Sequence, residues 1–320
     1  MKPLLILKTG TTLPAIAEAR GDFEDWIGEG MAFSSDELEV ASVFEGDSLP
    51  DPDSLSGVVV TGSSALVTEK EDWSERSAAW LPRAIDRKIP LLGICYGHQL
   101  LAHAVGGRVE RNPLGREIGT VEVRFGDSAK DDELLRVLPD QISVQVSHVE
   151  SVVKLPPGAT HHGASAGDLN QAFAFGTCAW GVQFHPEFDA DIVRGYIRGR
   201  RALLVDEGID PEALLSAAND TDHGTALLRR FGEIVRTRAE SESGRPRAIE
   251  FLFGGAASAR DRPTGSVRHS VRARAPGREN TLHVESEINL VLLQHTFELP
   301  RGFTHHARHF CLKVARSSVV

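Results

Sequence analysis

A cysteine flanked by glycines stands where an apolar run gives way to a helical pattern. The residues Leu91–Ile94 precede Cys95, and Gly93 and Gly97 lie two positions away on either side. The pattern G-x-C-x-G between a strand and a helix predicts a nucleophile elbow, a tight turn that holds a thiol out of a sheet. Unpaired N–H groups and the helix dipole at a helix N-terminus favour the thiolate over the thiol. Cys95 is therefore the candidate nucleophile.

A free cysteine can also be a small buried apolar residue, so Cys95 needs partners to count as a nucleophile. A catalytic thiol needs a base and a group that orients the base. The segment WGVQFHPEF supplies both, because His185 and Glu187 are two apart and would project to the same side of a strand. Pro186 cannot donate to a strand ladder, which indicates that the strand ends there. These residues predict a Cys-His-Glu triad that performs acyl transfer.

The elements around these residues alternate between strands and helices. Apolar runs of strand length are PLLILKT, ELEVASVF, GVVVTG and IPLLGI, and a more β-rich region follows Gly107. Alternation of this kind predicts an α/β fold with a mostly parallel central sheet flanked by helices. The active site of such a sheet lies at the carboxyl ends of its strands. We therefore expect the segments VVVTGSS, LLGICYG and GVQFHPE to converge there.

Some residues outside this constellation have simpler interpretations. The sequence predicts one helix over residues 14–31. It predicts a further helix around the proline at position 82, which should bend or break it. The adjacent His161 and His162 follow a Pro-Gly pair and are expected in a surface loop. We expect the arginines of a late helix, Arg198, Arg200 and Arg201, to form a solvated face.

The composition divides the chain in two. Residues 1–240 carry the alternating pattern and are predicted to form one domain, whereas residues 241–320 are net basic and rich in Arg, Gly, Pro and Ser. Such a composition buries little apolar surface, which predicts an irregular, poorly ordered C-terminal tail of unknown role. The tail could dock a partner, but we expect that deleting residues 244–320 leaves Cys95-dependent hydrolysis intact.

The global numbers narrow the class of protein. The 320 residues are 41% hydrophobic and 25% charged, which is typical of a soluble globular protein. A net charge of -10 argues against nucleic-acid binding, which needs a basic surface. Three cysteines do not predict a disulfide framework, and no apolar run reaches the roughly 20 residues of a membrane helix. With a first apolar run too short for a signal peptide, we expect a soluble cytoplasmic protein.

The paired motifs PLLGICYGHQLL and WGVQFHPE resemble the signature of class I glutamine amidotransferases. The resemblance covers roughly residues 1–240 and extends to stand-alone amidotransferase-like proteins and the glutaminase part of GMP synthetase. A third match, VQVSHVES, implies that Ser147 and His148 line the glutamine pocket, and a further match implies the same for Gln99.

The family also implies an oxyanion site made of backbone N–H groups. One donor would be Tyr96, directly after the nucleophile. The other would come from the turn 61–64, which reads Thr-Gly-Ser-Ser where the better-known relatives have a Gly-Gly-Pro type. Without the second glycine, the second donor is either Gly62 or Ser63.

The resemblance implies an enzyme that hydrolyses the γ-amide of glutamine through a γ-glutamyl thioester on Cys95, with no metal or other cofactor. The ammonia would pass to a separate synthetase subunit, since the sequence shows no second catalytic domain. An alternative is a hydrolase of γ-glutamyl peptides that uses the same triad. A non-catalytic binding or regulatory protein is the third possibility, disfavoured because Cys95, His185 and Glu187 are all present.

Overall fold

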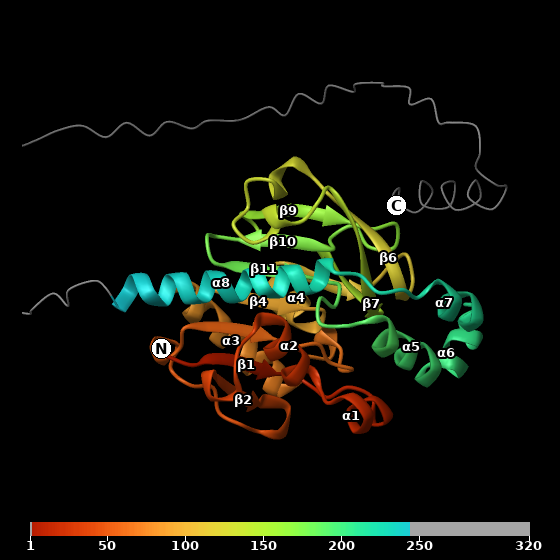
Figure 1. Ribbon diagram of the computed structural model, residues 1–320, viewed down its shortest axis with the longest axis horizontal. Helices are drawn as coiled ribbons and strands as arrows, with labels where there is room; N and C mark the ends of the chain where they lie inside the picture. Colours follow the sequence, from red (N-terminus) through yellow and green to blue (C-terminus); the bar gives the residue numbers. More distant parts are fainter. Residues whose placement is uncertain (1, 244–320) are drawn as a thin grey trace, which may run out of the picture. The chain divides into compact units, whose positions relative to one another are not determined.

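Short, buried apolar runs form the parallel half of a nine-stranded sheet (Figure 1). The computed structural model describes residues 2–243. Its strands are β1 (Leu4–Lys8), β2 (Leu38–Ser42), β3 (Gly57–Val60), β4 (Leu91–Ile94), β5 (Arg108–Arg111), β6 (Glu117–Phe125), β7 (Gln141–His148), β8 (Glu150–Lys154), β9 (Ala159–Ala164), β10 (Ala172–Phe175) and β11 (Ala179–Val182). The sheet order is β2-β1-β3-β4-β11-β10-β9-β6-β7, and β5 pairs with β8 separately.

The central strands confirm the predicted fold class. Strands β2, β1, β3, β4 and β11 run parallel, and β10, β9, β6 and β7 extend the sheet in antiparallel fashion. All residues of β1, β3, β4 and β11 are buried. Continuous burial is expected for parallel strands covered on both faces.

Helices cover both faces of this sheet (Figure 1). They are α1 (Pro14–Arg20), α2 (Phe23–Met31), α3 (Asp72–Asp86), α4 (Tyr96–Ala104), α5 (Ala190–Gly199), α6 (Arg201–Asp206), α7 (Pro211–Ala217) and α8 (His223–Ser243). Alternate residues of β1 point to opposite faces. Leu4 and Ile6 belong to the core that includes α2, α5 and α8, whereas Leu5 and Leu7 belong to the core that includes α3 and α4.

Two local expectations were wrong, and a third was wrong in part. The range 14–31 forms two helices, because Gly21 has a left-handed φ of 81° and Asp22 caps α2 with a capping box. The helix does not break at Pro82, which lies inside α3, and the alternative of a bend there stays a prediction. His161 and His162 lie on β9 rather than in a surface loop, and His162 is buried against Ser128.

The C-terminal boundary stays a prediction. Helix α8 runs to Ser243 and thus passes the boundary expected near residue 240. The rest of the predicted tail, residues 244–320, lies outside the described residues. Among the helices of residues 2–243, none is long and apolar enough to cross a membrane.

Two long-range contacts bring the predicted site residues together. Strand β11 is the parallel neighbour of β4, with Val182 opposite Ile94, so the residues after both strands leave at the same edge. The chain after β11 then meets β7, where His185 forms an isolated antiparallel bridge with Gln145. This bridge draws the far edge of the sheet toward the carboxyl ends of the central strands.

Candidate active site

Cys95 occupies the strained turn between β4 and α4. Its φ of 51° and ψ of -100° are unusual for a residue other than glycine. A Cβ at Gly93 would collide with the carbonyl of Gly97, and a Cβ at Gly97 would collide with the carbonyl of Val60. The two glycines therefore let strand and helix approach closely enough to make the elbow that the sequence predicts.

His185 and Glu187 lie together next to the thiol. The His185 Nδ1 is 2.7 Å from Oε1 of Glu187, and the imidazole is close enough to Cys95 for their charges to interact. Phe188 stacks on the imidazole with ring centroids 4.0 Å apart, and Phe23 lies parallel to it at 6.2 Å. Two aromatic rings thus restrict how the imidazole can turn. The geometry has the arrangement expected of a nucleophile, a base and an orienting carboxylate.

The electrostatics of the site favour a thiolate and an imidazolium. Burial alone would raise the pKa of the Cys95 thiol, but the neighbouring His185 and His148 outweigh it, and the pKa lies below its ordinary value. Burial alone would lower the pKa of His185, but Glu187 and Cys95 raise it to about 10. Each charge of the pair stabilises the other, because both sit in a buried site of low polarity.

A glutamine that the sequence analysis missed also contacts the sulfur. The Gln183 Nε2 lies 3.6 Å from the Cys95 sulfur, and its Oε1 accepts from Nε2 of Gln99 at 3.0 Å. The same nitrogen of Gln99 donates to the backbone carbonyl of Glu150 at 2.8 Å. Gln183 precedes His185 by two residues, so the period of a strand could have placed it on the thiol side.

His148 has a buried carboxylate of its own. Its Nε2 is 3.0 Å from Oε2 of Glu117, and its Nδ1 is 2.9 Å from the carbonyl of Glu150. Glu117 also accepts from Ser165 and Gln171, both at 2.6 Å. Although burial opposes a charge on His148, the hydrogen bond to Glu117 and the charge of Cys95 raise its pKa. No sequence motif singles out Glu117, since its partners come from distant segments.

The turn after β3 is fastened to the end of β1. The Thr9 hydroxyl donates to the carbonyls of Thr61 and Gly62, each at 3.0 Å, and Ser63 donates to the carbonyl of Thr9 at 2.8 Å. A Cβ at Gly62 would lie 2.8 Å from Cε1 of His185. The turn is therefore held beside the imidazole, and the backbone N–H groups of Tyr96, Gly62 and Ser63 donate to no other group within residues 2–243.

Two adjoining cavities lie at this edge. The thiol cavity, about 40 Å³, is lined by Cys95, Tyr96, Gln99, Ser147 and His148 among others. The imidazole cavity, about 210 Å³, is lined by residues 11–14 and by Phe23, His185 and Tyr196. Ser63, Ser64, Ser147 and Arg200 line both cavities. All the residues predicted for the site thus line these two cavities or lie directly beside them.

Arg200 corrects the expected solvated face. Arg198 and Arg201 are exposed as expected, but Arg200 is half-buried and lies between α5 and α6, where the helix path breaks. The break turns this side chain inward, away from the face that its neighbours share. The charge pattern of the sequence could not show that Arg200 faces inward, because the prediction treated this segment as a single continuous helix.

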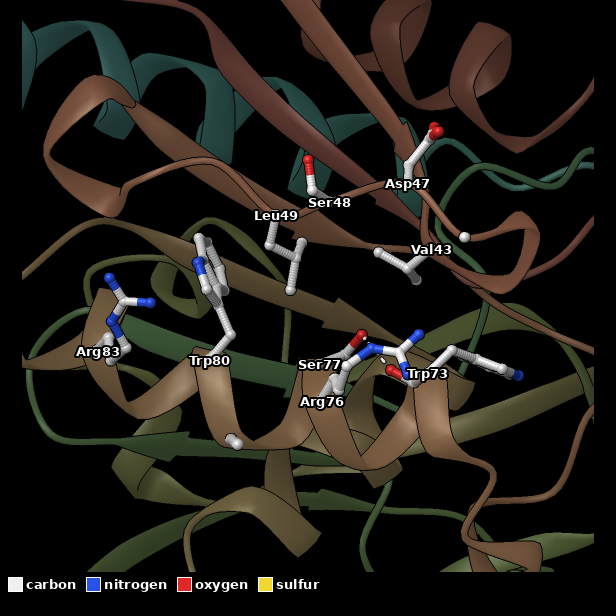
Figure 2. A pocket seen from close by; sticks show the side chains of 11 residues that line it. Val43, Asp47, Ser48, Leu49, Trp73, Arg76, Ser77, Trp80 and Arg83 are labelled. Carbon is white, nitrogen blue, oxygen red and sulfur yellow. Dashed lines mark hydrogen bonds between the residues drawn. The ribbon is translucent and has the colours of Figure 1, made fainter.

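A larger hollow of about 510 Å³ lies between the segment 43–49 and α3 (Figure 2). Figure 2 shows Arg76, Trp80 and Arg83 on α3, with Asp47, Ser48 and Leu49 across from them. The lining includes neither cysteine nor histidine. We therefore place the candidate active site at the smaller cavities around Cys95. Within residues 2–243, no group of three or more His, Cys, Asp or Glu side chains is placed to hold a metal ion.

Comparisons with known proteins agree with the motifs. The family model of glutamine amidotransferase class-I matches residues 42–192. A glutamine-hydrolysing GMP synthase of Syntrophomonas wolfei is 34% identical over 149 residues, which cover 44% of this chain and 27% of that protein. One subunit of the glutamine-hydrolysing GMP synthase of Saccharolobus solfataricus is 35% identical over 131 residues, which cover 41% of this chain and 66% of that protein.

A solved structure extends the likeness to the whole described fold. The crystal structure of a glutamine amidotransferase from Thermotoga maritima aligns with a TM-score of 0.58 and 26% identity, and covers 73% of this chain and 98% of that one. The match to the Syntrophomonas wolfei protein spans about a quarter of its length. Motifs, family model, relatives and fold lead to one conclusion: the chain belongs to the class-I glutamine amidotransferase family.

Proposed function

We propose that this protein hydrolyses the γ-amide of glutamine through a γ-glutamyl thioester on Cys95. The observation that carries the proposal is the elbow thiol with the His185–Glu187 pair beside it, at the carboxyl edge of a parallel sheet. A buried thiol that shares its site with an imidazole and a carboxylate suits acyl transfer. Family membership supports glutamine as the acyl donor.

The chemistry proceeds in two steps. The Cys95 thiolate attacks the γ-carbonyl carbon, and the N–H groups of Tyr96 and of Gly62 or Ser63 hold the oxyanion. The carbon–nitrogen bond breaks as His185 gives its proton to the leaving nitrogen, and ammonia departs. Water then attacks the thioester, and His185 accepts a proton from it. The carbon–sulfur bond breaks, glutamate leaves, and the Cys95 thiolate and the imidazolium are restored. Glu187 keeps the imidazole oriented and stabilises its charge throughout.

The substrate side chain would enter the thiol cavity. Gln99 is fixed there by its bonds to Gln183 and to the carbonyl of Glu150. The Ser147 hydroxyl is buried and has no hydrogen-bond partner among the described residues, which leaves it available to a ligand. His148 brings a positive charge to the same wall. In this proposal Gln99, Ser147 and His148 bind the glutamyl group.

The released ammonia would be used by a separate acceptor enzyme. The Saccharolobus solfataricus relative is itself named as a subunit of a GMP synthase. The present chain matches only 27% of the Syntrophomonas wolfei GMP synthase, and the family model matches residues 42–192. We propose a partner synthetase for this reason.

A paired assay tests the proposal. The full chain and Cys95→Ala are each incubated with glutamine, and ammonia and glutamate are measured. Cys95-dependent release of both is the expected result. Acid-quenched samples should carry a γ-glutamyl adduct on the peptide that contains Cys95. A wild-type rate equal to that of Cys95→Ala, with and without a candidate synthetase, would contradict the proposal.

The imidazole cavity favours a second candidate, hydrolysis of γ-glutamyl peptides. The leaving nitrogen must be close to His185, and that residue lines a cavity of about 210 Å³. A water molecule occupies roughly 30 Å³ in the liquid, so the cavity has room for more than ammonia. The same assay with γ-glutamylglycine distinguishes the two. Release of glycine without hydrolysis of glutamine would indicate a γ-glutamyl peptide hydrolase. Hydrolysis of neither compound would favour a non-catalytic role.

A further inference from the structure

Arg200 is a cation without a counter-ion at the junction of the two cavities. Its Nε is buried and has no hydrogen bond, and no ion pair among residues 2–243 includes its guanidinium. The guanidinium carbon lies 5.6 Å from the centre of the Tyr196 ring, a contact that holds it over an aromatic face. Nearby arginines differ, since Arg194 pairs with Asp191 and Arg201 with Glu212.

The surroundings of Arg200 make an anion favourable. Burial lowers the pKa of Arg200, and the charge of Arg116 lowers it further. Arg116 is neutralised by a two-pronged contact with Glu207, at 2.8 and 3.1 Å. A half-buried charge that lacks a partner is costly, and a bound anion removes that cost. The missing partner of Arg200 is therefore supplied best by a ligand.

The position of Arg200 shows which part of a ligand it would meet. It lines the thiol cavity together with Cys95 and the imidazole cavity together with His185. In the proposed reaction the acyl carbon lies at the thiol and the leaving nitrogen at the imidazole. Ser147, which also lines both cavities, has the buried unpartnered hydroxyl described above. A substrate that spans the scissile bond would thus pass in front of both residues.

We propose that Arg200 is the specificity-determining residue that binds a carboxylate of the γ-glutamyl substrate. The inference rests on the proposed function for its choice of substrate class. A planar guanidinium pairs with a carboxylate through two parallel hydrogen bonds, which suits an amino-acid ligand. The carboxylate is either the α-carboxylate of the glutamyl group or that of a leaving amino acid. Both sources share the chemistry, and the experiment separates them.

The test measures binding in a full-length Cys95→Ala protein, so that no ligand is consumed. Calorimetry gives the affinity for glutamine, glutamine α-amide, γ-glutamylglycine and γ-glutamylglycinamide. Each is compared between that protein and its Arg200→Gln derivative. Arg200→Lys keeps the charge and should retain part of the affinity. Arg198→Gln is the matched control, because Arg198 is an exposed arginine two residues away that lines neither cavity.

The expected result is a loss confined to ligands that carry the recognised carboxylate. Arg200→Gln should weaken their binding on the order of 10- to 100-fold and leave the matching amide unchanged. Loss for glutamine and γ-glutamylglycine, with glutamine α-amide spared, identifies the α-carboxylate. Loss for γ-glutamylglycine alone, with the glycinamide spared, identifies the leaving group. Arg198→Gln should change none of these affinities.

Three results would overturn the inference. They are equal losses for all four ligands, no change for any ligand, and no binding of any of the four ligands to the Cys95→Ala protein. A thermal melt of each variant separates misfolding from lost recognition. Turnover by the unmutated chain tests the proposed function independently. Carboxylate-dependent binding without Cys95-dependent hydrolysis would support the role of Arg200 and reject the proposed reaction. Cys95-dependent hydrolysis without carboxylate-dependent binding would support the reaction and reject the role of Arg200.

Discussion

His148, which lines the cavity that holds Cys95, forms a buried ion pair with Glu117 at 3.0 Å. Both ring nitrogens of His148 face acceptors, the carboxylate on one side and the carbonyl of Glu150 on the other. An imidazolium donates from both nitrogens and therefore suits both acceptors, in agreement with the raised pKa of His148. Two histidines, His185 and His148, thus act on the charge of Cys95, and each has a carboxylate beside it.

The pair predicts a stability that depends on pH. The pKa of His148 is raised in the folded protein, mainly by Glu117 once the opposing effect of burial is overcome. Its contribution is therefore complete below an unfolded pKa of about 6.5 and lost as pH rises through the folded value. Glu117→Gln should cost about 1–3 kcal/mol in urea unfolding at pH 6, and less as the pH is raised.

A surface variant provides the control for this measurement. Glu212 pairs with Arg201, and both side chains are more than half exposed. Such a pair contributes little to stability. Glu212→Gln should leave the free energy of unfolding almost unchanged from pH 6 upward. A penalty for Glu117→Gln that stays constant or grows with pH would contradict the ion pair.

Glu187 should control the charge state of the thiol through His185. Glu187→Gln removes the carboxylate that helps to hold the pKa of His185 near 10, so that pKa should fall and the imidazolium beside Cys95 becomes less stable. The pKa of Cys95, now below its ordinary value, should then rise. We expect the pH midpoint for iodoacetamide alkylation of the Cys95 peptide to move upward. Turnover should fall on the order of 10²- to 10⁴-fold, and an unmoved midpoint would argue against the triad.

Gln183 should matter to both the thiol and the pocket. Gln183→Leu removes a donor to the Cys95 sulfur and one acceptor for Gln99. The alkylation midpoint should rise, and the KM for glutamine should increase several-fold because Gln99 is less firmly held. Gln141→Leu is the control, since Gln141 lies exposed on β7 and contacts Glu122. Equal behaviour of the two variants would mean that the contact with sulfur has no effect.

Gly97 should tolerate no side chain. A Cβ there would overlap the backbone carbonyl of Val60, which belongs to a fully buried strand and cannot move aside. Gly97→Ala should destabilise the protein by at least about 1–3 kcal/mol in urea unfolding. Gly126→Ala is the control, because the nearest atoms to its added Cβ would lie 3.9 Å away. Similar penalties for the two glycines would show that the elbow is less tightly packed than the structure indicates.

The elbow and the placing of His185 and Glu187 beside Cys95 were predictable because their determinants are local. Glycines two residues on either side of Cys95 set the turn, and the period of a strand puts His185 and Glu187 on one side. The order of strand and helix signals likewise predicts a parallel sheet, whose carboxyl edge is where these segments must meet. Gln183 obeys the same period and could have been identified with them.

Other features of the site were decided only by the tertiary structure, because they depend on contacts between distant segments. Glu117 reaches His148 because β6 and β7 pair in register, and β7 reaches the thiol because Gln145 bridges to His185. Arg200 turns inward because the helix path breaks between α5 and α6. No repeat or spacing in the sequence encodes these contacts, since each depends on where a whole element packs. The sequence by itself thus determined the candidate reacting groups, and the packing of the sheet determined the charges and cavities around them.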